Sequence, residues 1–125
     1  MSSQSAAGGV TPALPASFPG RIVLKRDGEF HFVRATDVVW IEAEGDFIKV
    51  HTLQGAHLVR QTLTRLAASL DPAVFLRVHR SAIVNSHRIE KIAPLYRGDY
   101  LITVTGGAQV RSSRAYAASV QSLLG

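Results

Sequence analysis

Short apolar runs separated by glycine-containing turns begin at Arg21 and continue along most of the chain. Several runs alternate apolar and polar residues, which is typical of strands with one buried face, and they are rich in valine and isoleucine. The run 38–41 is apolar throughout and predicts a strand buried on both faces. The pattern as a whole predicts a mainly β, antiparallel domain. The expected strands are 21–25, 30–34, 38–41, 47–53, 57–60, 75–78, 82–84, 89–92, 100–104 and 108–111.

One segment between these strands has helical spacing instead. Leu63, Leu66 and Leu70 lie at positions i, i+3 and i+7, which form one face of a short helix. Thr62 is placed to cap the N-terminus of this helix, and Asp71-Pro72 ends it.

A second helix is predicted over residues 114–124, with Ser112 or Ser113 as its cap. Free amides at a helix N-terminus favour an anion such as phosphate. Arg114 in the first turn opposes the helix dipole, which indicates a task outside the helix. The apolar stripe that packs this helix consists of Tyr116, Val120, Leu123 and Leu124.

Composition limits the class of protein. Residues 1–20 are mainly Ser, Ala, Gly and Pro, which predicts a flexible leader or linker, and residues 21–125 are expected to form one domain. The chain has no cysteine, which excludes disulfides and thiolate metal sites. It shows no signal peptide and no apolar run of membrane-spanning length, so a cytoplasmic location is expected, without a membrane.

The net charge of +5 is unevenly distributed along the chain. Seven basic residues balance seven acids over residues 21–75, whereas residues 76–114 carry seven basic residues, six of them arginine, and two acids. Such a stretch indicates nucleic acid, an anionic membrane or an acidic protein as partner, or else a solvated basic face. Arginine is the side chain best suited to bidentate contacts with phosphate and guanine.

The segment 75–85 (FLRVHRSAIVN) interleaves apolar and polar residues within this basic stretch. Its valine and isoleucine residues can anchor it in a core, which leaves His79, Arg80 and Ser81 at an exposed bend. Arg80 then projects from a short, firmly held loop that loses little entropy when it enters a groove. His79 and Ser81 can hydrogen-bond the local backbone or a phosphate, and Asn85 is expected to organise its own turn.

Several motifs, in this order, resemble the LytTR family of bacterial DNA-binding domains. The resemblance covers residues 21–124. The matching segments are WIEAEGDFIKVH at 40–51, Thr62-Leu-x-x-Leu66 followed by Leu70, residues 75–85 followed by Ile89 and Ile92, and Ser113-Arg-x-Tyr116.

This resemblance implies an elongated arrangement of small antiparallel sheets, a β-β-β sandwich with one short internal helix and a C-terminal helix. It implies sequence-specific binding of double-stranded DNA in bacterial transcription regulation. Loops at 45–47, 79–81 and 113–114 would enter successive major grooves of a bent duplex, on paired direct repeats. Family members commonly follow a phosphorylated receiver domain, for which a leader of 20 residues is too short. We therefore expect a stand-alone regulator or a piece of a longer protein.

The same resemblance assigns candidate site residues. Arg80 and Arg114 are the candidates for base contacts, most simply with guanine O6 and N7. Asp46 could accept a hydrogen bond from cytosine N4 or serve only as a turn residue, and Phe47 stands where many relatives have tyrosine. The candidates for contacts with the DNA backbone are His79, Ser81, Lys49, His51, Arg60, Arg77, His87, Arg88 and Ser113.

Other functions fit the sequence less well. Ser81 beside a histidine suggests a hydrolase, but no G-x-S-x-G elbow accompanies it, so no enzyme is expected. The histidines match no metal-ligand spacing, and neither a metal nor another cofactor is expected. Most of the aromatic residues look buried and are not laid out as an exposed platform for stacking RNA bases. The alternative is an interaction module that pairs with and inhibits another LytTR-type regulator. Arg80 and Arg114 favour DNA, with a second copy on the adjacent repeat.

Overall fold

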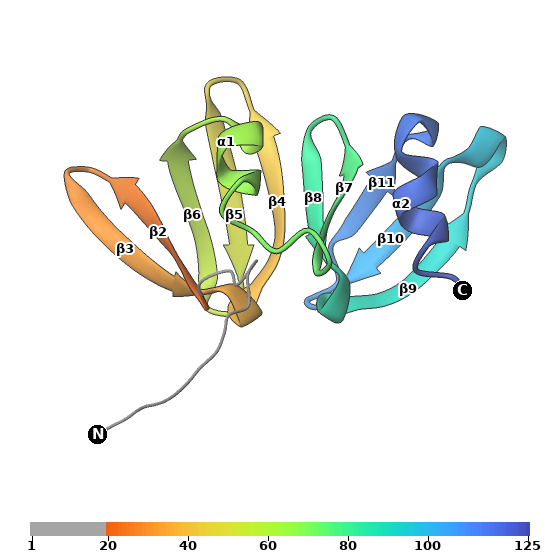
Figure 1. Cartoon of the computed structure of the whole chain (residues 1–125), viewed down its shortest axis with the longest axis horizontal. Helices are drawn as coiled ribbons and strands as arrows, with labels where there is room; N and C mark the ends of the chain where they lie inside the picture. The colour runs from red at the N-terminus through yellow and green to blue at the C-terminus, as the bar shows by residue number, and fades with distance from the viewer. Residues whose placement is uncertain (1–19) are drawn as a thin grey trace, which may run out of the picture.

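The computed structural model describes residues 20–125, which form ten strands in three antiparallel sheets (Figure 1). The sheets follow one another along the longest axis of the molecule, so the mainly β, elongated arrangement is confirmed. Each predicted strand is present with ends within three residues of the prediction. The predicted leader lies outside the described residues, apart from Gly20. The strands are β2 (Arg21–Arg26), β3 (Glu29–Arg34), β4 (Val38–Glu44), β5 (Phe47–Thr52), β6 (Gly55–Arg60), β7 (Phe75–His79), β8 (Ala82–Asn85), β9 (Ile89–Pro94), β10 (Tyr100–Val104) and β11 (Gln109–Ser112).

The central sheet carries five strands in the order β6-β5-β4-β8-β7, flanked by the β2–β3 hairpin and by the sheet β11-β10-β9. Two hydrophobic cores lie between these layers, and β4 contributes to both. Val38 and Ile41 are fully buried in the first core, and Val39 is buried in the second. The predicted burial of this strand on both faces is confirmed.

The first helix, α1 (Leu63–Ala67), begins where the sequence predicts. The Thr62 hydroxyl accepts a hydrogen bond from Arg65 N at 3.1 Å, and Leu63 and Leu66 are buried against the first core. Leu70 is also buried but lies beyond the end of the helix. None of the helices within residues 20–125 has the length and hydrophobicity that a membrane-spanning helix needs.

The predicted C-terminal helix over 114–124 is wrong in its start and length. A 3-10 turn, η5 (Arg114–Tyr116), precedes a shorter helix, α2 (Ala117–Gln121), and Ser113 makes no side-chain cap. Ser112 is buried and accepts a hydrogen bond from Tyr100 N at 3.1 Å, so its hydroxyl holds β10 and not the helix. The other 3-10 turns are η2 (Ala35–Asp37), η3 (Ser86–Arg88) and η4 (Tyr96–Gly98).

Thr62→Ala is expected to lower the free energy of unfolding by about 0.5–2 kcal/mol, because it leaves an amide of a short helix without its acceptor. Urea denaturation measures this loss. Thr64→Ala, at an exposed position inside the same helix, is the matched control and should change stability far less. Equal effects of the two substitutions would contradict a capping role for Thr62.

Two histidines meet where the β2–β3 hairpin lies against β6. The rings of His31 and His57 are 5.9 Å apart between centroids, and His57 Nδ1 is buried without a hydrogen-bond partner among residues 20–125. Burial lowers the pKa of His57 from its ordinary value of 6.5, and the charges of Arg26 and His31 lower it further. The folded protein therefore favours neutral His57.

His57→Gln is expected to lose less stability than the wild type on acidification to about pH 5. The unfolded chain binds a proton at His57 as the pH falls through 6.5, before the folded chain does, so acid lowers the stability of the wild type. Urea midpoints measured over this pH interval test the expectation. His87→Gln, at an exposed histidine, serves as the control. Parallel pH profiles for wild type and His57→Gln would refute it.

Candidate nucleic-acid interface

The turn between β7 and β8 presents Arg80, as the sequence predicts. Arg80 is exposed, whereas Val78, on the strand that leads into the turn, is fully buried. The guanidinium of Arg77 donates from Nε to the carbonyl oxygen of His79 at 2.9 Å and from Nη2 to the carbonyl oxygen of Arg80. Arg77 therefore braces the backbone that carries Arg80.

His79 and Ser81 are bonded to each other within this turn. His79 Nδ1 accepts a hydrogen bond from Ser81 N at 3.1 Å and lies 2.8 Å from Ser81 Oγ. The structure thus shows local bonding for both side chains, one of the two uses that the sequence leaves open. Arg80 is the side chain of the turn that remains directed to solvent.

Two backbone hydrogen bonds tie this turn to neighbouring loops. Ala43 N donates to the carbonyl oxygen of Ser81 at 2.8 Å, close to the Gly45-Asp46 turn that joins β4 and β5. Ser113 N donates to the carbonyl oxygen of Val78 at 3.0 Å. The three predicted loops, at residues 45–47, 79–81 and 113–114, are therefore neighbours along one edge of the molecule (Figure 1). We call this edge the loop edge.

A fourth loop, which joins β9 to β10, lies beside Arg114 on the loop edge. It is η4, where Arg97 has a φ of +61° and Tyr96 is 89% exposed. A Cβ added to Gly98, whose φ is +83°, would lie 3.3 Å from Cβ of Arg114, so the loop packs directly against that residue. Sequence reasoning missed Tyr96 and Arg97, and the excess of arginine in this stretch was the only signal for Arg97. The expectation of buried aromatic residues is wrong for Tyr96, and also for Phe30, Phe32 and Phe47, which are exposed.

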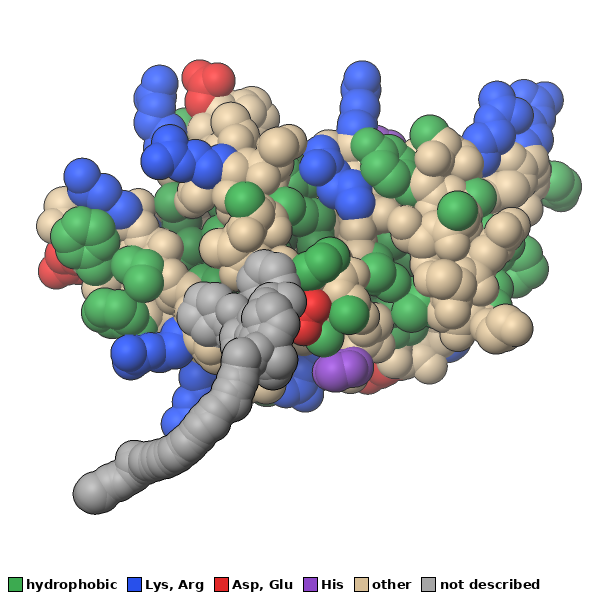
Figure 2. Space-filling model, in the orientation of Figure 1, with side chains coloured by type: hydrophobic (Ala, Val, Ile, Leu, Met, Phe, Trp, Pro, Cys, Tyr) green, Lys and Arg blue, Asp and Glu red, His purple; other side chains and the backbone are tan. Residues whose placement is uncertain are grey.

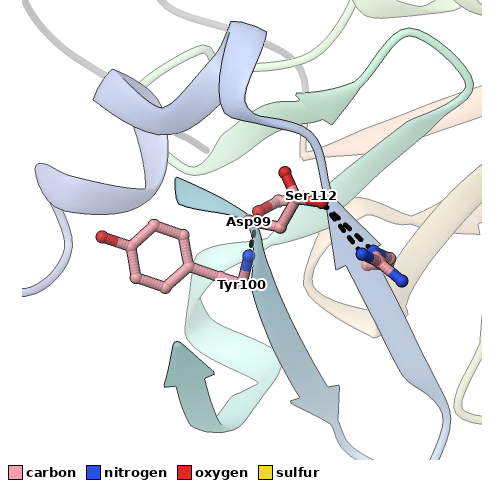
Figure 3. A network of polar contacts seen from close by, with 4 residues as sticks. Asp99, Tyr100 and Ser112 are labelled. Carbon is pink, nitrogen blue, oxygen red and sulfur yellow. Dashed lines mark hydrogen bonds and ion pairs between the residues drawn. The ribbon is translucent and has the colours of Figure 1, made fainter. Parts of the chain in front are cut away.

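A polar network joins the fourth loop to β11 (Figure 3). Asp99 Oδ2 lies 3.1 Å from Arg111 Nη2 and 3.3 Å from Arg111 Nε, and the adjacent Tyr100 amide is the donor to Ser112 Oγ. Arg111 and Asp99 thus neutralise each other. Arg97 and Arg114 form no ion pair with another described residue, so their charge is available on the surface.

The other end of the loop edge gathers basic groups around a hollow of about 450 Å³. Arg60 lies opposite Phe47 across β5 and β6, with its guanidinium carbon 5.9 Å from the ring centroid. Figure 2 shows Lys and Arg side chains projecting at several points along this edge, whereas acidic side chains project from it at a single point. The hollow is lined by residues that include Asp46, Phe47, Arg60, Arg77 and Arg80.

Lys49 and His51 lie within the central sheet, away from the turns. His51 stacks on Trp40 with ring centroids 4.5 Å apart and an interplanar angle of 2°, and its Nε2 lies 2.6 Å from Glu42 Oε2. Lys49 is directly opposite Glu42 on the neighbouring strand. Both side chains thus face the acidic group of Glu42 on one face of the sheet.

His87 and Arg88 follow β8 at the end opposite the Arg80 turn. Arg88 Nε and Nη2 donate to the carbonyl oxygen of Thr36 at 3.0 and 2.7 Å. Asn85 is buried, accepts from His87 N at 2.9 Å and donates to the carbonyl oxygen of Val38 at 2.8 Å. The expected turn role of Asn85 is confirmed, and these neighbours lie away from the loop edge.

Known proteins are similar to this chain in sequence or in fold. The fold is similar to the LytTr DNA-binding domain of a response regulator from Bacillus cereus, with a TM-score of 0.75, 27% identity, and coverage of 86% of this chain and 98% of that one. The sequence is 22% identical over 121 residues to the transcriptional regulatory protein LytR of Staphylococcus aureus. It is 30% identical over 92 residues to the sensory transduction protein LytT of Bacillus subtilis.

The matched region is only part of these relatives. The alignments cover 97% of this chain but 49% of LytR, and 74% of this chain but 38% of LytT. A family model described as the LytTr DNA-binding domain matches residues 28–125. This range includes the four loops of the loop edge, the central five-stranded sheet and the sheet β11-β10-β9. The chain therefore belongs to the LytTR family of DNA-binding domains.

Proposed function

We propose that the loop edge binds double-stranded DNA with sequence specificity and thereby regulates bacterial transcription. The observation that carries this proposal is a row of exposed arginines that form no ion pair with any residue in 20–125. Backbone hydrogen bonds join the loops of two of them, Arg80 and Arg114. Arg80 and Arg114 extend from neighbouring loops, and Arg60 and Arg97 lie beyond them on either side. A row of arginines carried by neighbouring elements of a β-sheet domain suits the repeating phosphates and grooves of a duplex.

In this proposal the arginines have different tasks. Arg80 and Arg114 read base edges in the major groove, where a guanidinium matches O6 and N7 of guanine. Arg60 and Arg97 contact phosphates, while Arg77 holds the Arg80 turn in position. Asp46 borders the same hollow as Arg80. In this proposal it accepts a hydrogen bond from cytosine N4, the alternative being that it serves only as a turn residue.

The remaining candidates for backbone contacts fall into two groups. His79, Ser81 and Ser113 belong to the loop edge. In this proposal they lie next to the phosphates beside Arg80 and Arg114, with His79 and Ser81 still bonded to each other. Lys49, His51, His87 and Arg88 lie away from it, and the proposed interface does not use them. Paired direct repeats, with a second copy on the adjacent repeat, remain the expected operator.

Selection from random duplexes tests the proposal. The wild type and the Arg80→Ala/Arg114→Ala double variant are carried through several rounds in parallel at low and physiological salt. Enrichment of one motif by the wild type alone would support sequence-specific regulation and supply the operator. Weak, salt-sensitive binding without enrichment, equal in both proteins, would reduce the loop edge to a basic surface. The interaction module that pairs with another LytTR-type regulator would then be favoured.

Arg60→Gln is expected to weaken binding by a similar factor on the operator and on random DNA, and to reduce the salt slope of log K by about 1. The reason is that a phosphate contact releases a counterion but recognises no base. Fluorescence anisotropy over a salt series measures both quantities. Lys91→Gln, an equal loss of charge on the exposed side of β9, is the control and should leave both quantities near wild type. A loss confined to the operator would contradict the phosphate role of Arg60.

A further inference from the structure

The outer face of the β2–β3 hairpin is apolar where a two-stranded sheet normally meets water with polar side chains. Val23, Phe30 and Phe32 are 50%, 63% and 62% exposed, and alternation places them on the face that points away from the first core. The opposite face of the hairpin supplies Ile22, Leu24 and Val33 to that core. Packing within the described residues thus explains one face of the hairpin and leaves the other without a cover.

Basic side chains frame these apolar residues. Across the two strands Val23 is opposite Phe32, Lys25 is opposite Phe30, and Arg21 is opposite Arg34. The Arg21 guanidinium carbon lies 5.1 Å from the Phe32 ring centroid, and Lys25 Nζ lies 5.9 Å from that of Phe30. We call this surface the hairpin face; Figure 2 shows its green patch and neighbouring blue side chains at the left end of the molecule. Its members are Arg21, Val23, Lys25, Phe30, Phe32 and Arg34.

The charges of the hairpin face lack a counterpart. Arg21 and Arg34 lie directly opposite each other, an arrangement of like charges that destabilises a strand pair. Neither they nor Lys25 forms an ion pair with an acid anywhere in residues 20–125. A carboxylate placed between the two arginines would convert this repulsion into an attraction.

We propose that the hairpin face docks an acidic segment of another protein, one that carries carboxylates beside apolar side chains. Phenylalanine and arginine are the residue types enriched in protein interfaces, and exposed apolar patches rimmed by charge mark such interfaces. The apolar side chains of the partner cover Val23, Phe30 and Phe32, and its carboxylates pair with Arg21, Arg34 and Lys25. This surface is separate from the loop edge, so the inference does not depend on the proposed DNA binding.

Other occupants fit the chemistry less well. A second copy docked through the same face in a two-fold dimer would set cations against cations. The phosphates of a duplex would satisfy the cations but leave the two phenylalanine rings against polar backbone. An anionic bilayer would take the rings into the boundary between headgroups and acyl chains, and the vesicle measurement below distinguishes it from a protein partner. Residues 1–19 contain no acid, so the preceding segment supplies no carboxylate.

Selection from a displayed library of short random peptides, with the full chain as bait, tests the proposal. The wild type should enrich peptides that combine acidic and apolar residues, and their affinity should fall as salt rises. The affinity of these peptides for the double variants Phe30→Ser/Phe32→Ser and Arg21→Gln/Arg34→Gln should be at least about tenfold lower than for wild type. Leu124→Ser, an exposed apolar residue at the opposite end of the chain, is the control and should bind like wild type.

Three outcomes would overturn the docking proposal. The first is an absence of enrichment, or enrichment of peptides that bind every variant equally. The second is binding of phosphatidylglycerol vesicles that is lost in Phe30→Ser/Phe32→Ser, which would make the occupant a membrane. The third is a loss of duplex DNA binding in that variant as large as its loss of peptide binding, which would make the hairpin face part of the DNA interface. The Arg21→Gln/Arg34→Gln variant keeps the proposal testable if the serine variant is unstable.

Discussion

Arg80→Ala is expected to weaken binding to the selected operator by about 1–3 kcal/mol and to relax the preference at one base pair. The exposed guanidinium extends from a turn whose backbone is bonded to Arg77 and Ala43, so it meets a base edge without first ordering its loop. Arg114→Ala is expected to lose a similar amount, but at a different position of the same operator. Titration of each variant against a set of operators with single base-pair changes measures both the loss and its position.

The comparison with random DNA separates base contacts from phosphate contacts. Both alanine variants should bind random duplexes only slightly less well than wild type, because each loses one positive charge but no base contact. If Arg80→Ala loses as much on random DNA as on the operator, Arg80 contacts phosphate and not bases. If Arg114→Ala leaves the preference at every base pair unchanged, the same conclusion holds for Arg114.

Ile41→Ala is expected to lower the free energy of unfolding by about 2–5 kcal/mol. Ile41 is fully buried at the centre of the five-stranded sheet, with β5 on one side and β8 on the other, so the deleted atoms leave a cavity that neighbouring side chains cannot easily fill. Calorimetry and urea denaturation measure the loss. Leu58→Ala, on the exposed side of β6, is the matched control and should cost far less. A melting temperature unchanged by Ile41→Ala would show that this position is not core.

Local patterns were sufficient to predict the strands. Turns such as Asp27-Gly28, where both residues have positive φ, are determined by neighbouring residues, and alternation assigns each strand a buried face. The same locality explains why Thr62 and Asn85 were correctly assigned to a cap and a turn. These features depend on contacts between residues close in sequence.

The candidate site depended on contacts that no local pattern encodes. The bonds from Ala43 to Ser81 and from Ser113 to Val78 join segments more than thirty residues apart in sequence, and they determine which loops share an edge. Arg97 belongs to the loop edge because its turn packs on Arg114, a contact that no pattern in the sequence predicts. The C-terminal helix was misjudged because Ser112, which looked like a cap, is instead the acceptor for a strand amide.

The hydrogen bonds that join the Arg80 turn to its neighbours have a consequence for the DNA. Loops held in this way cannot move far to follow a duplex, so on the proposed mode of binding the duplex must adapt its curvature to them. The energy of that deformation depends on the base steps between the contacted positions, because flexible pyrimidine–purine steps kink more easily than stiff A-tracts. Operators with identical contacted bases should therefore differ in affinity according to the stiffness of the spacer that no side chain touches.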